Sequence, residues 1–272
     1  MKQGRTVSVP EFETLMHRAR SGARHFVTNF YVPRDQWGSR LQHGLRVLKR
    51  GDHVLILVRA EHKCSRLFFA GSRAALPAAL SGIKASPTRP LVVDLIGRTA
   101  EVQALSTEFC AAGFRSYLRL IRMSRFGHFQ FENQDGAAAG CGPAGPRDAR
   151  SILKLLRGHF DFYTDRLPSK EEIRAAIAEG DLRLARNGRH LDGFLWQEKI
   201  GVTSTVRYWC TDDQARGRGV GGRLMRDYFH NNRESTRHLL WVRENNATAI
   251  NCYLHYGYAP DGLQDHVLLR ER

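Results

Sequence analysis

A glycine-rich turn between a strand pattern and a helix pattern places the strongest constraint on how this chain folds. The segment Arg216–Arg223 reads RGRGVGGR and contains four glycines. Before it, Thr203–Thr211 alternates with the period of two that is typical of a β-strand. One face of this strand is expected to carry Val206, Tyr208 and Cys210. After the turn, Leu224–Phe229 fits an amphipathic helix.

A strand-to-helix turn of this kind is suited to binding a phosphate group. The first N–H groups of a helix have no partners inside the helix, and they lie at the positive end of its dipole. Glycines let the chain turn tightly and let a bulky anion approach the backbone, so a phosphate or pyrophosphate is the expected ligand. The spacing fits neither the Walker loop nor the dinucleotide loop. A surface turn without a ligand is the alternative at this point.

A second motif follows the first in the chain. After the buried-strand pattern Leu239–Val242, the chain reads NATAINCYLHYGY from Asn246 to Tyr258. Together the two motifs resemble the GNAT superfamily of N-acetyltransferases, whose patterns are Q/R-x-x-G-x-G/A and N-x-x-A-x-x-[aliphatic]-Y-x-x-x-G-[FY]. The Asn, Ala, Tyr, Gly and closing aromatic residues all fall at the family's offsets. The resemblance covers about the last 135 residues, half of the chain.

The resemblance implies an α/β (α+β) fold with the mixed central sheet of GNAT type in the C-terminal half. It also implies acetyl-CoA or another acyl-CoA as co-substrate, and no metal. In the family the donor lies in a wedge where the strand before the loop separates from the strand after it, and open backbone groups of the first strand pair with the pantetheine amides. The donor-binding residues implied here are Trp209, Cys210, Thr211, Arg216, Gly217, Arg218, Gly219, Val220, Gly221, Gly222 and Asn246.

Acyl transfer to an amine needs groups that move protons. The amine must be neutral to attack, and the leaving thiolate benefits from a proton. The resemblance gives Tyr253 this general-acid role, with an ordinary core aromatic as the alternative. The general base stays open, because the position where some family members carry a glutamate is Trp241, which instead is suited to lining an acceptor pocket. The candidates are Glu198, Glu244, Asp212, Asp213 and a water chain.

The acceptor itself is not identified by the sequence. In the family the acceptor pocket is built from the first two helices and a variable loop. The corresponding stretch here contains Phe160, Asp161, Phe162, Tyr163 and Asp165.

The N-terminal half looks like a degenerate copy of the C-terminal half. Residues 91–122 and residues 239–270 both run strand, helix, Gly-aromatic, strand. The first copy has Phe109 where the second has Tyr253, and it lacks the R-x-x-G-x-G pattern. An unrelated α/β domain is the alternative. A further helix is expected over Ser39–Lys49, from leucines at helical spacing. The predicted organisation is a degenerate GNAT-like domain without a donor site at 1–131, a linker at 132–139, and a catalytic GNAT domain at 140–272.

The positive charge is concentrated in the N-terminal half. The net charge is +15, and residues 1–150 carry +12 of it. Such an excess suggests an acidic partner at this half, such as RNA or an acyl carrier protein. A basic, solvated surface without a partner is the alternative.

Cysteine usage and hydropathy bear on the compartment. No apolar run approaches the roughly 20 residues that span a bilayer, and no secretory signal is evident. The five cysteines are scattered and form no C-x-x-C, which argues for a reducing environment. We therefore expect a cytoplasmic protein without a membrane partner, and its oligomeric state is open.

Three functions are compatible with these observations. The leading hypothesis is an N-acyltransferase that moves an acetyl or other acyl group from coenzyme A to an amine by direct attack. The second is an acyltransferase whose donor is a carrier protein or an aminoacyl-tRNA docked on the basic N-terminal half. The third is a non-catalytic sensor that binds CoA without turnover.

Overall fold

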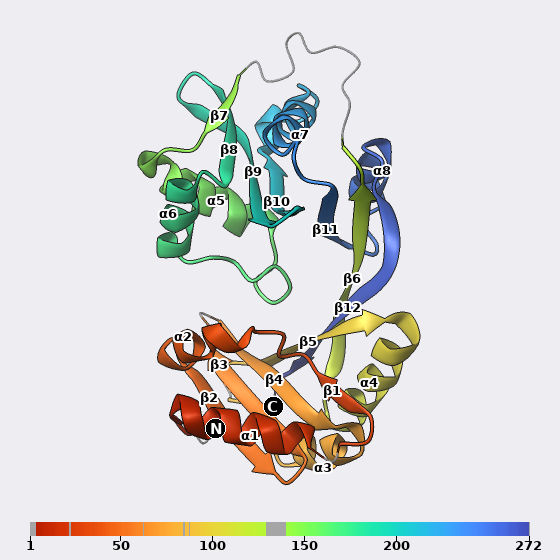
Figure 1. The fold of residues 1–272 in the computed structure, drawn as a ribbon. Coiled ribbons are helices and arrows are strands. Elements are labelled where there is room, and N and C mark those ends of the chain that lie inside the picture. Colours follow the sequence, from red (N-terminus) through yellow and green to blue (C-terminus); the bar gives the residue numbers. More distant parts are fainter. Residues whose placement is uncertain are drawn as a thin grey trace. The chain divides into compact units, whose positions relative to one another are not determined.

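The chain is divided into two compact units (Figure 1). The computed structural model describes residues 4–128, except 22, 62, 84 and 87, and residues 140–271. Unit 1 consists of Met1–Leu120 and Gly262–Arg272, and unit 2 consists of Ile121–Asp261. Two long strands, β6 (Arg115–Phe126) and β12 (Ala259–Arg270), each contribute residues to both units.

Unit 1 is a mixed sheet with helices on its faces. Its strands are hydrogen-bonded in the order β2-β3-β4-β5-β12, and β1 pairs with β4. Adjacent strands are antiparallel except β4 and β5, which are parallel. The elements are α1 (Val9–Arg20), β1 (Phe26–Thr28), α2 (Trp37–Gln42), β2 (Leu45–Gly51), β3 (Val54–Ala60), β4 (Ser65–Ser72), α3 (Leu76–Ser81), β5 (Leu91–Arg98) and α4 (Thr99–Ala111).

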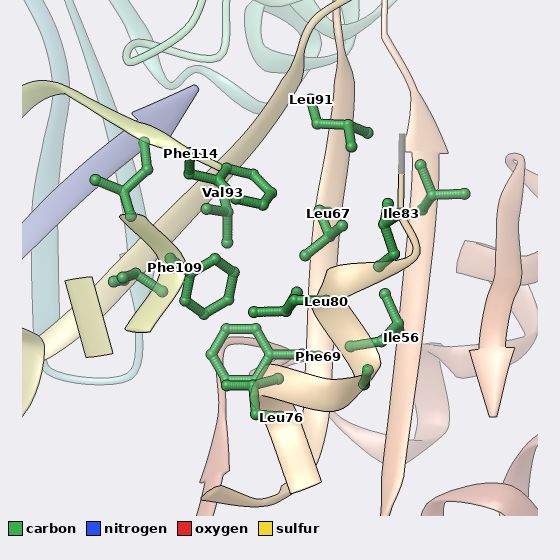
Figure 2. Packing of buried hydrophobic residues seen from close by; sticks show 14 of the residues in the cluster. Ile56, Leu67, Phe69, Leu76, Leu80, Ile83, Leu91, Val93, Phe109 and Phe114 are labelled. Carbon is green, nitrogen blue, oxygen red and sulfur yellow. The ribbon is translucent and has the colours of Figure 1, made fainter. Parts of the chain in front are cut away.

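The sheet of unit 1 buries a hydrophobic cluster on each face. Alternate residues of β3 belong to different clusters: Ile56 packs with α3 and α4, whereas Leu57 packs with α1 and α2. Figure 2 shows the first cluster, in which Leu80 and Phe109 lie close to Phe69 of β4. The rings of Phe69 and Phe109 have centroids 5.4 Å apart. The period-two alternation of a strand thus supplies both cores.

The two parallel strands of unit 1 separate soon after they meet. Only Ser65 and Arg66 of β4 pair with β5, although the strands continue to Ser72 and Arg98. The segment that contains β1 lies along the separated part of β4, from Ala70 to Ser72. The N-terminal segment therefore occupies the gap that opens between the two strands.

Asn29, directly after β1, fills this gap with hydrogen bonds. Its main-chain N–H donates to the carbonyl of Phe69 at 3.2 Å, and its Oδ1 accepts from the N–H of Phe69 at 2.8 Å. Its Nδ2 donates to the carbonyl of Leu67 at 3.1 Å and to the carbonyl of Asp94 on β5 at 3.0 Å. Asn29 is buried. Backbone groups of both separated strands are thus satisfied by the chain itself.

Unit 2 repeats the pattern of unit 1. Its strands run in the order β11-β10-β9-β8-β7, and the neighbours are antiparallel except for the parallel pair β10 and β11. The elements are β7 (Cys141–Pro143), α5 (Ala149–His159), α6 (Lys170–Glu179), β8 (Leu182–Asn187), β9 (His190–Ile200), β10 (Thr203–Thr211), α7 (Val220–Asn231), β11 (Arg237–Arg243) and α8 (Ala247–His255). One core packs under α7 and α8, and another packs under α5 and α6.

The compact units do not coincide with the domain boundaries predicted from the sequence. Strand β12 pairs with β5 from Leu263 to Arg270, so most of the last strand belongs to unit 1 rather than to the C-terminal unit. A hydrophobic strand pattern reveals a strand but not its hydrogen-bonding partner. The predicted linker at 132–139 lies outside the described residues.

The helix expected over Ser39–Lys49 is wrong. Helix α2 ends at Gln42, and strand β2 begins at Leu45. Between them Gly44 has φ of +90°, in the left-handed region that glycine adopts most readily. The leucines at helical spacing therefore belong to two elements.

Replacing Asn29 with Ala is expected to destabilise unit 1. The change leaves the N–H of Phe69 and the carbonyls of Leu67 and Asp94 without the Asn29 side chain as partner. Unpaired buried backbone groups of this kind cost about 3 kcal/mol in total, which a denaturant titration would detect. The control is Asn187→Ala at the exposed end of β8, expected to change stability by less than about 0.5 kcal/mol. Equal stability of the two variants would contradict the role of Asn29.

Candidate functional site

The parallel strands of unit 2 also separate, and no described segment pairs with β10 in the gap. Strand β10 pairs with β11 only from Thr203 to Val206, opposite Arg237 to Leu240. Beyond this point β10 continues to Thr211, with β9 on its other side. In the described part of unit 2, no strand pairs with the β11-facing edge of β10 after Val206. Open backbone groups therefore line one side of a wedge.

A bulge at Arg207 changes the direction of the side chains along β10. The register with β9 shifts between Val206 and Tyr208. Val206 packs in the core under α7 and α8, whereas Tyr208 and Cys210 pack in the core under α5 and α6. The prediction that these three residues share one face is therefore wrong, because it assumed an uninterrupted strand. The bulge leaves Trp209 on the α7 side of the wedge.

The glycine-rich turn lies open at the start of α7. Gly217 and Gly219 have φ of +77° and +70°, which requires the left-handed backbone that glycine permits. A Cβ added at Gly217 would meet no atom within 4 Å. Among the described residues no acceptor is found for the backbone N–H groups of Gly217, Gly219, Val220, Gly221 and Gly222. The turn thus presents a set of unpaired donors at a helix N-terminus.

The three arginines of the turn are held around it. Arg216 pairs with Asp213 at 2.8 Å, and Arg218 pairs with Asp192 at 3.2 Å. Arg223 donates to the carbonyl of Arg218 at 2.8 Å. Because the paired guanidinium groups are largely exposed, they contribute positive potential more than strong fixed bonds.

Trp209 lies between the turn and helix α8. Its ring centroid is 5.5 Å from that of Tyr253 and 6.2 Å from that of Tyr256. A Cβ at Gly221 would come within 3.1 Å of the Trp209 ring, so the glycine allows this packing. The indole Nε1 is buried and has no hydrogen-bond partner within the described ranges. A buried donor without a partner is rare in proteins, so this indole N–H is suited to donate to a ligand in the wedge.

Helix α8 presents the predicted general acid. Asn246 caps the helix, and its Oδ1 accepts from the N–H of Ala249 at 3.1 Å. Tyr253 is buried, and burial raises the pKa of its phenol. No hydrogen bond to the Tyr253 hydroxyl is present among the residues that the structure describes. The phenol therefore stays protonated at neutral pH and has a proton to donate.

Three of the predicted base candidates are already engaged in ion pairs or caps. Glu198 is exposed and accepts from Arg207 at 2.7 Å. Asp212 accepts from the N–H of Gln214, and Asp213 pairs with Arg216. Glu244 is exposed. None of these contacts connects a candidate to Tyr253.

The loop between α5 and α6 contacts both strands of the wedge. From β10, the Tyr208 hydroxyl donates to the carbonyls of Asp165 and Arg166 at 2.7 and 3.0 Å. From β11, Arg243 donates to the carboxylate of Asp165 at 3.2 Å. Burial raises the pKa of Asp165 above that of an ordinary aspartate. The sequence placed Asp165 in the acceptor stretch, but no local pattern revealed its burial.

Several solved structures superimpose on most of this chain. A GCN5-related N-acetyltransferase from Sphaerobacter thermophilus superimposes with a TM-score of 0.60 at 14% identity, over 87% of this chain and 83% of that one. One from Kribbella flavida gives 0.55 at 16% identity, over 86% and 93%. The chain has the GNAT fold. The predicted fold class is thereby confirmed.

The GNAT likeness extends over both units. A tandem GNAT protein from the clavulanic acid biosynthesis pathway matches with a TM-score of 0.56 at 12% identity, over 96% of this chain and 94% of that one. The common strand pattern of units 1 and 2 agrees with such a tandem GNAT arrangement. No protein-family model and no curated protein sequence matches the chain.

Two further properties concern metals and membranes. The described residues contain no group of three His, Cys, Asp or Glu side chains placed to hold a metal ion. No helix in the described ranges is long and apolar enough to span a bilayer.

His238 on β11 is a buried group that makes the stability of unit 2 depend on pH. Its ring nitrogen Nδ1 lies 3.0 Å from the Tyr228 hydroxyl, and the residue is 1% exposed. Burial, helped by the positive charge of Arg125, lowers the pKa of His238 from 6.5 to about 4. The folded protein thus keeps this imidazole neutral where an unfolded chain would protonate it.

Acid is therefore expected to destabilise unit 2 through His238. Between pH 6.5 and 4 the unfolded state binds a proton that the folded state does not, so stability falls by up to about 3 kcal/mol. The measurement is the unfolding free energy at several pH values for the wild type and for His238→Asn, which does not titrate. A smaller acid dependence in the variant supports the assignment, and identical slopes would rule it out.

Proposed function

We propose that this protein is an acyl-CoA-dependent N-acyltransferase, which moves an acetyl or another acyl group to an amine by direct attack. The observation that carries the proposal lies within a GNAT fold: the glycine turn has N–H groups without partners among the described residues, beside a strand edge that no described strand pairs with. A diphosphate next to an extended, amide-bearing arm is the ligand that such a pair of features fits. Coenzyme A has both parts.

The residues of the wedge have the chemistry to hold this donor. The backbone amides from Gly217 to Gly222 would bind the pyrophosphate, and Arg216, Arg218 and Arg223 would attract it. The open edge of β10 at Trp209, Cys210 and Thr211 would pair with the pantetheine amides, and the unpartnered indole N–H of Trp209 is a further donor. Asn246 keeps its Nδ2 available while its Oδ1 caps α8.

The thioester supplies an electrophilic carbonyl and a thiol leaving group when bound. A neutral amine attacks the carbonyl carbon, the C–N bond forms and the C–S bond breaks. Tyr253 gives its proton to the departing sulfur. Burial raises the pKa of this phenol, so at neutral pH it still holds the proton when the thiolate forms. The phenol is then restored by the proton that the nitrogen loses as the amide forms.

Direct attack is favoured over a covalent relay by the environment of Cys210. This thiol points into the core under α5 and α6, and burial raises its pKa to about 12. A thiol with so little thiolate at neutral pH is a poor nucleophile. Cys210 therefore contributes backbone groups to the wedge and no acyl intermediate.

Gly219→Asp is expected to abolish donor binding. A carboxylate at the start of α7 repels an anionic diphosphate, and a side chain strains the left-handed backbone. We expect acetyl-CoA affinity, measured by calorimetry, to fall at least about 100-fold. Gly188→Asp is the matched control, since Gly188 has φ of +57° in a turn between β8 and β9. Equal acetyl-CoA affinities of the two variants would contradict the assignment of the turn as the diphosphate-binding site.

Tyr253→Phe is expected to lower turnover without weakening donor binding. Thiol release from acetyl-CoA would be followed with a panel of polyamines, amino sugars, amino acids and peptides. Loss of the general acid should lower kcat about 100-fold. Tyr258→Phe removes a hydroxyl from a neighbouring buried ring, 6.0 Å from that of Tyr253, and should have little effect on kcat. Tight binding with no turnover for any amine would instead indicate a CoA sensor.

One acetyl-CoA is expected to bind per chain, although the chain contains two related units. In unit 1 the gap between β4 and β5 is occupied by Asn29, and the N–H of Arg73 at the following turn donates to the carbonyl of His25. Calorimetric titration with acetyl-CoA should therefore give a stoichiometry near one. Two equivalents of bound acetyl-CoA would show that the segment leaves the gap.

A further inference from the structure

The α5–α6 loop is held in place by both strands of the wedge. Tyr208 of β10 binds two consecutive carbonyls of the loop, and Arg243 of β11 binds the Asp165 carboxylate. Arg166 has φ of +45°, a left-handed backbone that is costly for a residue other than glycine. The Tyr208 hydroxyl holds the carbonyl of this strained residue. The loop therefore has a defined position beside the separated strands.

One oxygen of Asp165 is left available in this arrangement. Its Oδ2 accepts from the N–H of Asp161 at 2.6 Å and from Arg243 at 3.2 Å. Its Oδ1 has no hydrogen-bond donor among the described residues. The side chain of Asp165 is half-buried, at 17% exposure, and a carboxylate oxygen accepts hydrogen bonds, so Oδ1 is able to accept one from a substrate.

The position of Asp165 complements that of Tyr253. Tyr253 packs in the core under α7 and α8, on one face of the sheet. Asp165 is bound to Tyr208, which packs in the core under α5 and α6 on the other face. The wedge between β10 and β11 lies between these faces. A proton donor for the leaving group and a proton acceptor for the attacking group are thus on opposite sides of the gap.

We propose that Asp165 is the general base, and that its free Oδ1 accepts a proton from the ammonium group of the acceptor. This inference rests on the proposed acyltransferase function. The ammonium gives one proton to Asp165, and the neutral amine then attacks the thioester carbonyl. The second nitrogen proton is lost as the amide forms and replaces the one that Tyr253 gives to the thiolate. Asp165 returns its proton to water, which reaches a side chain that is 17% exposed.

The surroundings of Asp165 fit a base rather than a structural ion pair. Burial raises its pKa, and this effect exceeds the opposing influence of Arg243 and of the Asp161 N–H. Burial also raises the pKa of Tyr208 to about 12, so its hydroxyl stays protonated and bound to the loop. The charged or titratable groups that face Asp165 are Arg243 from β11, Tyr208 from β10 with the adjacent Arg207–Glu198 pair, and Asp161 in the loop itself.

The decisive variant is Asp165→Asn, assayed with the amine of the panel above that has the highest kcat/KM. The asparagine oxygen can still accept from Arg243, so the loop contacts persist. We expect kcat/KM to fall about 100-fold at pH 7. In the variant only the free amine reacts, and with an amine pKa of about 10 its fraction rises about tenfold per pH unit. The ratio of wild-type to variant kcat/KM should therefore fall about tenfold per pH unit up to pH 9.

Arg243→Gln tests the same role without removing the carboxylate. Arg243 opposes the rise in the pKa of Asp165, so its loss should raise that pKa further. The acid limb of the kcat/KM profile should then move to higher pH. A merely structural pair would lower activity at all pH values without moving the limb. If Asp165→Asn does not fold, the pH profile of Arg243→Gln still tests whether Asp165 is the base.

Asp181→Asn is the matched control. Asp181, in the turn between α6 and β8, also has its pKa raised mainly by burial, but it lies at the other end of α6 from the loop. We expect the kcat/KM–pH profile of Asp181→Asn to match that of the wild type. The acetyl-CoA affinity should be unchanged in Asp165→Asn, Arg243→Gln and Asp181→Asn. Parallel kcat/KM–pH profiles for the wild type and Asp165→Asn would overturn the role of Asp165 but leave the proposed acyltransferase function standing. Absence of both acetyl-CoA binding and turnover in the wild type would overturn the proposed function and this inference with it.

Discussion

The separation of two parallel strands is the constraint on which the rest of this structure depends. Backbone N–H and C=O groups that leave a strand pair must find new partners, because leaving them unpaired in a protein interior is costly. Unit 1 meets this requirement internally, with the side chain and backbone of Asn29. In the described part of unit 2, the edge of β10 stays open after Val206. The same strand arrangement thus gives one closed unit and one unit that is suited to receive an extended ligand.

The open unit combines backbone and side-chain features that act on different parts of such a ligand. Glycines at the start of α7 leave donors without partners where the helix dipole is positive. The buried Tyr253 and the half-buried Asp165, on either face of the sheet, both have a raised pKa because the protein disfavours their charged forms. For a phenol this keeps a proton ready to give, and for a carboxylate it increases the tendency to accept one.

Much of the fold and part of the site were predictable from the sequence, for identifiable reasons. Two motifs with fixed spacing predicted the GNAT fold. Local patterns do not specify long-range partners, so the pairing of β12 with β5 and the position of Asn29 in the gap were not foreseen. The bulge at Arg207 adds one residue without a sequence signature, and it moved Tyr208 to the opposite face. The burial of Asp165 depends on contacts with β10 and β11, which are distant in the sequence.

The pairing of β12 with β5 also bears on how the protein is made. Unit 1 needs residues 263–270 to complete its sheet, and these are synthesised only after all of unit 2. During translation β5 therefore has an exposed edge while more than a hundred residues emerge from the ribosome. Unit 2 is continuous in the chain and is able to fold first. The N-terminal unit therefore completes its sheet only once β12 has been synthesised, after the continuous unit 2.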